Sequence, residues 1–250
     1  MEAAAKLLTA MAAFFGAVAW PATVFALLFL FRSELRLLLR TMPAVLNKIQ
    51  KASLVGINLE LDKVAAETDI AGEEKGKITP RQIEAAARIK IQTPQVGSET
   101  LLQELDRLCL EYDTIRRTMP AGSDRTRAMT RLLVKMRSLA PSLIEYIDVY
   151  KGSGSAGSRL AAIAMMQMDP PAGDLNWLRD RFSSEQPFVF YHAALALQNM
   201  ADILKTPHEK KRMLESVEHA LAIIRKFKGV PDLRTIEVLE MILNSLQKQS

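Results

Sequence analysis

Cysteine, aromatic residues, glycine and proline are all scarce in this chain of 250 residues. The single cysteine, Cys109, excludes an internal disulfide and a cysteine-rich metal site. Aromatic residues make up 6% of the chain, and the 11 glycines and 11 prolines fall mostly in clusters between apolar stretches. A composition of this kind, rich in Leu, Ala and Met, is typical of a helical protein with short turns. We therefore expect an all-α fold.

The sequence motifs of common catalytic sites are also missing. There is no Gly-x-Ser-x-Gly, no His-Glu-x-x-His, and no Gly-x-Gly-x-x-Gly that follows a strand. The three histidines, His192, His208 and His219, do not have the spacing of metal ligands. His192 begins an alanine-rich apolar segment and is predicted to be a packed residue. We expect no enzymatic activity, no catalytic or metal-binding residues and no cofactor.

The longest uncharged stretch runs from Leu7 to Phe31. A helix of about 25 apolar residues, at about 1.5 Å per residue, is long enough to cross the hydrocarbon core of a bilayer. The small residues at 17–19 resemble a signal-peptide cleavage site, so a cleaved signal is the alternative. The apolar run continues well beyond that site, which favours an anchor. Residues 1–53 are predicted to be a transmembrane anchor with a basic juxtamembrane helix.

Basic residues are concentrated on the C-terminal side of this stretch. Lys6 precedes it, whereas five basic residues follow it: Arg32, Arg36, Arg40, Lys48 and Lys51. By the positive-inside rule the C-terminal side is cytoplasmic. The expected location is the bacterial inner membrane, with a single span, the N-terminus outside and the bulk of the chain in the cytoplasm.

Residues 54–97 are predicted to contain a minor β element and an acidic linker. Apolar residues in 54–62 alternate with polar residues or glycine, which is the period of a half-buried strand. These apolar residues are Val55, Ile57, Leu59 and Leu61. The strand could pair with a second short candidate at 88–93. Alternatively, it could pair with a neighbouring chain, which would make the protein a homo-oligomer.

The sequence Thr79-Pro80-Arg81-Gln82 predicts the start of a helix. Thr79 is a suitable N-cap, Pro80 suits the first helical turn, and Gln82 completes a capping box. We expect this helix to end near Ala87.

Residues 98–151 are predicted to form a helical hairpin. Apolar residues recur at spacings of three and four on both sides of a Pro-Gly turn at 120–123, which is typical of two antiparallel helices. The Gly/Ser-rich segment 152–158 is predicted to be a flexible linker. Residues 159–250 then show one amphipathic helix after another, separated by short turns, and are predicted to be a helical bundle.

The hairpin turn is flanked by a concentration of basic residues: Arg116, Arg117, Arg125, Arg127, Arg131, Lys135 and Arg137. They could form ion pairs with the acidic residues of the first hairpin helix, each weak where exposed. They could also bind an anionic ligand, or dock an acidic protein partner. The candidate residues for anion or partner binding are Arg116, Arg117, Arg125, Arg127 and Arg131. Nucleic acid is not expected, because no aromatic residues are interleaved with these charges.

A resemblance extends over residues from about Leu101 to Leu243. The run GSRLAAIAMMQ, followed by WLRDRF and EQPFVFYHAALALQNMA, resembles a HEAT-like module of paired helices. Together with the stretch EYDTIRRTMPAGSDRTRAMTRLLVKMR, it is similar to an uncharacterised helical module of bacterial proteins associated with membrane anchors and conflict systems. The resemblance implies that the C-terminal bundle is HEAT-like and suggests a role in bacterial defence. It assigns no catalytic residues.

Three hypotheses for function follow. The first is a membrane-tethered, non-enzymatic helical adaptor or regulator that binds a partner protein in the cytoplasm. The second is an effector that oligomerises through its strand and anchor and perturbs the inner membrane. The third, ranked last, is an enzyme with an unrecognised helical active site.

Overall fold

A computed structural model describes residues 20–36 without 22, 26 and 35, and residues 54–67, 77–227 and 233–248. The chain divides into two units, residues 1–51 and residues 52–250. Each is described by itself.

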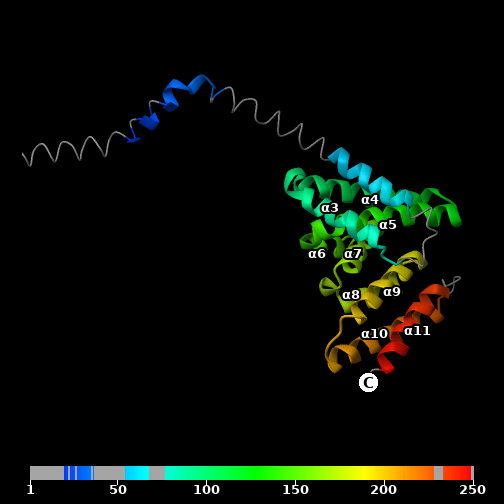
Figure 1. The fold of residues 1–250 in the computed structure, drawn as a ribbon. Helices are drawn as coiled ribbons and strands as arrows, with labels where there is room; N and C mark the ends of the chain where they lie inside the picture. Colours follow the sequence, from blue (N-terminus) through cyan, green and yellow to red (C-terminus); the bar gives the residue numbers. More distant parts are fainter. Residues whose placement is uncertain are drawn as a thin grey trace, which may run out of the picture. The chain divides into compact units, whose positions relative to one another are not determined.

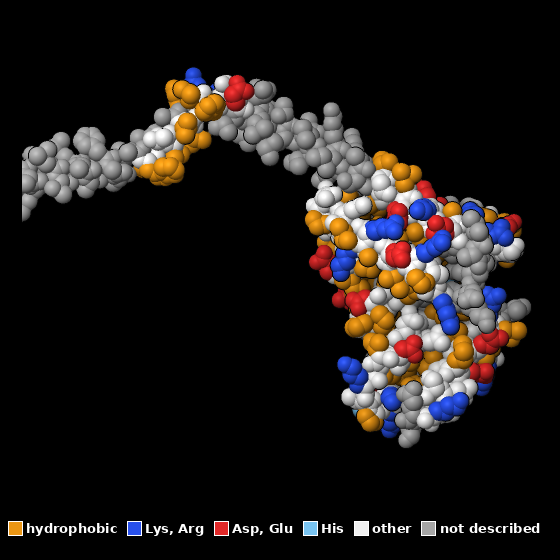
Figure 2. All heavy atoms as spheres, in the orientation of Figure 1, with side chains coloured by type: hydrophobic (Ala, Val, Ile, Leu, Met, Phe, Trp, Pro, Cys, Tyr) orange, Lys and Arg blue, Asp and Glu red, His pale blue; other side chains and the backbone are white. Residues whose placement is uncertain are grey.

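The described part of the first unit is a single helical segment with exposed side chains. Figure 2 shows apolar side chains along it, with charged ones towards one end. Phe25, Phe29 and Leu30 each expose two thirds or more of their surface. The predicted membrane span at 7–31 and the juxtamembrane helix lie largely outside the described residues. Among the residues that are described, no helix has both the length and the apolar character needed to cross a bilayer.

Among the described residues of the second unit the regular secondary structure is helical, with no strand, so the all-α prediction is confirmed. A helix over 54–67 comes first. The α-helices that follow are α3 (Pro80–Val96), α4 (Ser98–Thr118), α5 (Ser123–Leu143), α6 (Ile147–Lys151), α7 (Ala156–Met168), α8 (Leu175–Ser184), α9 (Pro187–Ala201), α10 (Pro207–Arg225) and α11 (Leu233–Gln247). Two 3-10 turns, η1 (Ile144–Tyr146) and η2 (Pro170–Ala172), lie between them.

These helices form two rows. The odd-numbered helices α3, α5, α7, α9 and α11 contact one another in that order. The even-numbered helices lie against them: α4 contacts α5 and α7, α8 contacts α9, and α10 contacts α8 and α11. Figure 1 shows the stack from the α3–α4 end to the α10–α11 end. One hydrophobic core runs through it, from Ile57 to Leu246.

The predicted strand at 54–62 is wrong, because these residues are helical. Ile57 and Leu61 are buried, whereas Val55 and Leu59 expose 57% and 65% of their surface. The alternating pattern contains a pair of apolar residues four apart, Ile57 and Leu61, and Val64 continues the same helical face. A period of two over a short run therefore could not distinguish a strand from a helix. The second strand candidate, 88–93, lies inside α3.

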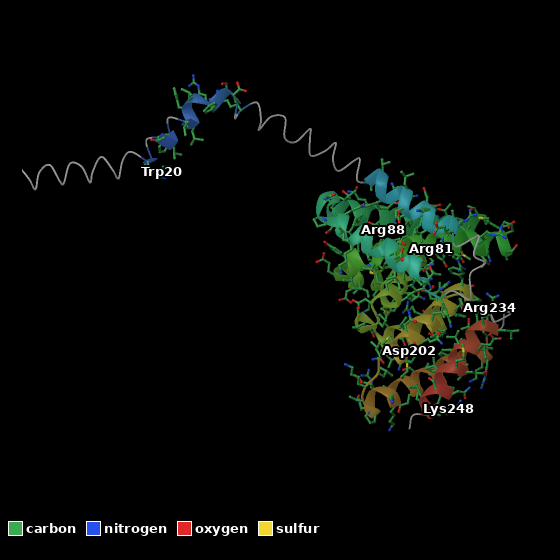
Figure 3. All side chains as sticks on the ribbon, viewed as in Figure 1. Trp20, Arg81, Arg88, Asp202, Arg234 and Lys248 are labelled. Atoms are coloured by element: carbon green, nitrogen blue, oxygen red, sulfur yellow. The ribbon has the colours of Figure 1, made fainter. Side chains whose placement is uncertain are left out.

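The helix over 54–67 is held by ion pairs to α3 and α5. Glu60 pairs with Arg88, and Glu67 pairs with Arg81, each at 3.0 Å. Figure 3 labels both arginines, which belong to α3. Asp62 accepts a hydrogen bond of 2.6 Å from Lys135 Nζ of α5. Residues 54–67 are thus an integral part of the stack.

The start of α3 is as predicted, but its end is not. Thr79 Oγ1 accepts a hydrogen bond from the backbone N–H of Gln82, and Pro80 occupies the first turn. The Gln82 side chain is fully buried and does not complete the capping box. The expected end near Ala87 is wrong, because buried Ile89 and Val96 continue the apolar face to the end of the helix.

Helices α4 and α5, on the two sides of the predicted turn, pack against each other as a hairpin. The 152–158 segment that follows it, expected to be a flexible linker, enters the first turn of α7 at Ala156. It is tied to α4 by the Asp113 carboxylate, which accepts hydrogen bonds from Ser155 Oγ and from the backbone N–H of Gly157. Gly157 also lies directly against the backbone of Cys109, so that α4 and α7 cross closely.

Candidate ligand-binding groove

The structure places the predicted basic residues around the end of the α4–α5 hairpin. Arg116 and Arg117 lie in the last turn of α4, and Arg125 and Arg127 lie in the first two turns of α5. Arg131 follows one turn further along α5 and is exposed. The four-residue turn between the helices therefore brings four of the five candidates to one end of the hairpin.

Several of these arginines serve the hairpin itself. Arg117 Nε donates to the carbonyl oxygen of Asp113, and Arg125 Nη1 donates to that of Met119, both at 3.3 Å. The carbonyl group of Met119, the residue that follows α4, lies beyond the last hydrogen bond of the helix, so the contact from Arg125 stabilises the end of α4. Arg127 lies 3.7 Å from Asp124 in an exposed pair.

Four acidic residues of α4 make their contacts with residues other than the basic residues of α5. Glu104 and Glu111 both pair with Arg107 of the same helix. Asp106 accepts a hydrogen bond of 2.8 Å from Tyr150 Oη. With Asp113 engaged by α7, four acidic residues that could have neutralised the basic residues of α5 have other contacts. Binding of an anion or partner at the hairpin stays a prediction.

A more enclosed site lies on the odd-numbered row. A cavity of about 260 Å³ opens beside α5, α7 and α9. Its polar and charged lining residues are Lys77, Arg137, Gln167, Gln198, Asn199 and Asp202. A second cavity, of about 430 Å³, lies between α9 and α11 and is lined in part by Tyr191, Arg234, Val238, Met241 and Asn244. Figure 3 labels Asp202, just after α9, and Arg234 in the first turn of α11.

The two cavities are neighbours. Lys77, Leu195 and Gln198 line both of them. We call the two cavities together the α9 groove, with its inner end at Arg137 and its outer end at Met241. Its walls come from residues as far apart in sequence as Lys77 and Asn244, so it depends on the stacking of the helices.

A chain of hydrogen bonds fixes the inner end. Arg137 Nε donates to Gln167 Oε1 at 2.7 Å, and Gln167 Nε2 donates to the backbone oxygen of His192, also at 2.7 Å. Asn199 Nδ2 donates to the backbone oxygen of Gln167 at 3.0 Å. The chain links α5, α7 and α9. Arg137 and Gln167 are essentially removed from solvent, where such groups are stable only with hydrogen-bonding partners.

His192 is a core residue, as predicted from the sequence. Its ring is buried and meets Phe188 edge-on, with ring centroids 4.6 Å apart. Burial lowers the pKa of His192 well below its usual value of 6.5, and the positive charge of Arg137 lowers it further. His192 is therefore neutral and carries no charge to the groove.

Cys109 is also buried, and burial raises the pKa of its thiol to about 12. It is a packing residue rather than a nucleophile. Among the residues that the structure describes, no cluster of His, Cys, Asp and Glu has the geometry of a metal site.

In the sequence Arg137 belongs with the basic residues near the hairpin turn, and the sequence does not predict the groove. One feature of the sequence does indicate that Arg137 is buried. Arg137 lies at spacings of four and eight from Leu133 and Met129, which are both buried, so it occupies the apolar face of α5. Gln167 and Asn199, in turn, interrupt apolar helices.

Comparisons with known proteins give no further guide. No protein-family model, no curated protein and no solved structure matches the chain. The HEAT-like relationship and the link to bacterial defence therefore stay predictions.

Proposed function

We propose that this chain is a membrane-tethered helical adaptor that binds an extended segment of a partner protein in the α9 groove. The observation that carries the proposal is that the two cavities are neighbours along α9 and share three lining residues. A depression that runs over several stacked helices suits a ligand longer than a small metabolite.

The lining of the groove fits a peptide. Leu195, Val238 and Met241 supply apolar surface, and Met241 is half exposed. The amides of Gln198 and Asn244 can donate to and accept from a peptide backbone. A mixture of apolar anchors and hydrogen-bonding groups is what protein interfaces use.

The proposed membrane tether is supported by the exposed apolar side chains of the first unit and by the sequence. The exposed apolar side chains of 20–31 find no cover within their own helix, and an exposed run of this kind favours a lipid environment. The basic residues after it favour the bacterial inner membrane with the second unit in the cytoplasm. The effector hypothesis loses its predicted oligomerisation strand, since residues 54–62 are helical.

The adaptor function can be tested by selecting random linear peptides against the full chain in detergent micelles. Met241→Arg places a bulky charge inside the groove, and it should weaken the binding of the selected peptides by about tenfold or more. Leu110→Arg is the matched control, because Leu110 is an exposed apolar residue of α4 outside the groove. Equal binding by both variants, or no selected peptide at all, would show that the groove is not the partner site.

The tether has its own test. Alkaline extraction of membranes from a bacterium that expresses the full chain should leave the protein in the pellet. Release into the supernatant would contradict the proposed anchor.

A further inference from the structure

The helix over 54–67 and α3 form an outer layer at one end of the odd-numbered row. They lie antiparallel, because Glu60 pairs with Arg88 and the later residue Glu67 pairs with the earlier residue Arg81. Both helices bury one face against the rest of the stack, so their exposed faces lie on the same side. Figure 1 shows the two helices next to each other. We call the exposed side of this layer the outer face.

The outer face carries apolar side chains on both helices. Val55 and Leu59 lie one turn apart and are exposed. On α3, the exposed residues Ile83, Ala87 and Ile91 follow at spacings of four, and Ile91 exposes 76% of its surface. Figure 2 shows apolar side chains beside charged ones over this part of the stack. The end of a helical stack normally has a polar outer face, so this one is suited to being covered.

The ion pairs between the two helices are arranged in depth. The side chains of Arg81 and Arg88 are 71% and 56% exposed, whereas those of their partners Glu67 and Glu60 are 31% and 24% exposed. The positive ends of these pairs therefore lie further out than the negative ends. Figure 3 labels both arginines along α3.

The remaining charges of the layer are also positive on balance towards solvent. Lys63 and Lys90 are exposed. Of the exposed carboxylates, Asp62 is engaged by Lys135 of α5, and Glu84 lies 3.8 Å from Arg88. The outer face thus combines apolar side chains with long basic side chains that reach into solvent.

We infer that the outer face docks on an anionic lipid surface, that of the bilayer which holds the proposed anchor. The inference rests on the membrane tether of the proposed function. Apolar side chains of such a face enter the boundary between head groups and acyl chains, while long basic side chains reach the anionic head groups.

The course of the chain favours the bilayer as the occupant. Residues 32–53 connect the exposed apolar segment that ends at Phe31 to helix 54–67, so the outer face begins where the chain enters the second unit. A tether of this length keeps the face near the bilayer, and a modest intrinsic affinity is then sufficient for docking. A second copy of the chain fits less well, because two outer faces would bring their exposed arginines together.

The inference is tested on the full chain in nanodiscs that contain phosphatidylglycerol. A fluorophore is attached to the new thiol of Leu59→Cys or Ile91→Cys, and nitroxide-labelled lipids quench a fluorophore that lies at the lipid surface. The native Cys109 is buried and does not compete for the label. We expect strong quenching at both positions. Val149→Cys is the matched control, because Val149 is an exposed apolar residue of α6, and its label should be quenched little.

Two lysines test the contribution of charge. The double variant Lys63→Gln, Lys90→Gln removes two exposed cations without changing a buried group. It should lower the ratio of docked to undocked protein by about tenfold or more, because each lysine near an anionic surface adds to the binding. The double variant Lys205→Gln, Lys211→Gln, exposed around the start of α10, is the control and should leave the ratio unchanged.

Failure of the inference differs from failure of the proposed function. If the protein stays in the disc but the labels at positions 59 and 91 are quenched no more than the control, the inference is overturned and the tether stands. Labels that are shielded from water without being quenched would also overturn it, since a second copy would then cover the face. Equal quenching in discs of phosphatidylcholine would overturn the assignment to an anionic surface. Release of the protein in the alkaline extraction described above would remove the tether and this inference together, and would leave the peptide selection at the α9 groove unaffected.

Discussion

The carboxylate of Asp113 accepts a hydrogen bond of 2.9 Å from the backbone N–H of Gly157, which joins α4 to the first turn of α7. The other carboxylate oxygen accepts a hydrogen bond of 2.6 Å from Ser155 Oγ. The first N–H groups of a helix have no partners within the helix, and a negative charge is favourable there. One side chain of the hairpin therefore holds the start of the helices that follow.

We expect Asp113→Ala to lower the free energy of unfolding by about 1–3 kcal/mol, because it removes both acceptors and leaves a partly buried N–H without one. Urea denaturation of the full chain in detergent micelles measures this loss. Glu111→Ala is the control, since Glu111 pairs with the exposed Arg107 and should contribute less than about 1 kcal/mol. Equal losses in the two variants would contradict the role given to Asp113.

The crossing of α4 and α7 gives a second prediction. A Cβ atom at Gly157 would lie 2.2 Å from the backbone oxygen of Cys109. Because both atoms would belong to the backbone region of a helix, this clash could be relieved only if α4 or α7 moved. We expect Gly157→Ala to lower the free energy of unfolding by about 2–4 kcal/mol. Gly154→Ala should have little effect, because no atom lies within 4 Å of the Cβ position there. A similar melting temperature for the two variants would mean that the helices do not cross this closely.

Local signals in the sequence mark where several helices begin. Thr79 and Pro80 start α3, Asp174 caps α8, and Thr206 and Glu209 form the capping box of α10. Each of these signals acts within four residues, so one short stretch of sequence contains all of the atoms that make the interaction.

Long-range contacts could not be predicted in this way. Asp113 and Gly157 are 44 positions apart, and Arg137 and Gln167 are 30 apart. Nothing local distinguishes Arg137 from the exposed arginines near it except its place on an apolar face. The α9 groove depends on which helices become neighbours, and a single sequence without a repeat does not specify that order.

The helical conformation of residues 54–67 gives a third prediction. In a strand, Ile57 and Leu59 would lie on the same face, and replacing either would have a similar effect. In the helix, Ile57 is fully buried and Leu59 is 65% exposed. We expect Ile57→Ala to lower the free energy of unfolding by about 2–5 kcal/mol and Leu59→Ala by less than about 1 kcal/mol. Similar losses would favour the strand.

The last prediction concerns stability below neutral pH. His192 is neutral in the folded chain because burial and the charge of Arg137 lower its pKa, whereas in the unfolded chain it titrates near 6.5. As the pH falls through 6.5, the unfolded state binds a proton that the folded state does not, so the folded state loses stability. Between about pH 7.5 and about pH 5.5 this loss should reach roughly 1.4 kcal/mol, and it should continue to grow at lower pH.

Urea denaturation at the two pH values measures the difference in wild type and in His192→Leu. The substitution lowers stability at both pH values, because it changes a packed site, but it should remove most of the pH-dependent part. His219→Gln is the control, since His219 is exposed on α10, and it should keep the wild-type dependence. If His192→Leu retains the full dependence on pH, another group takes up the proton, and the pKa of His192 is not lowered by its burial and by the charge of Arg137.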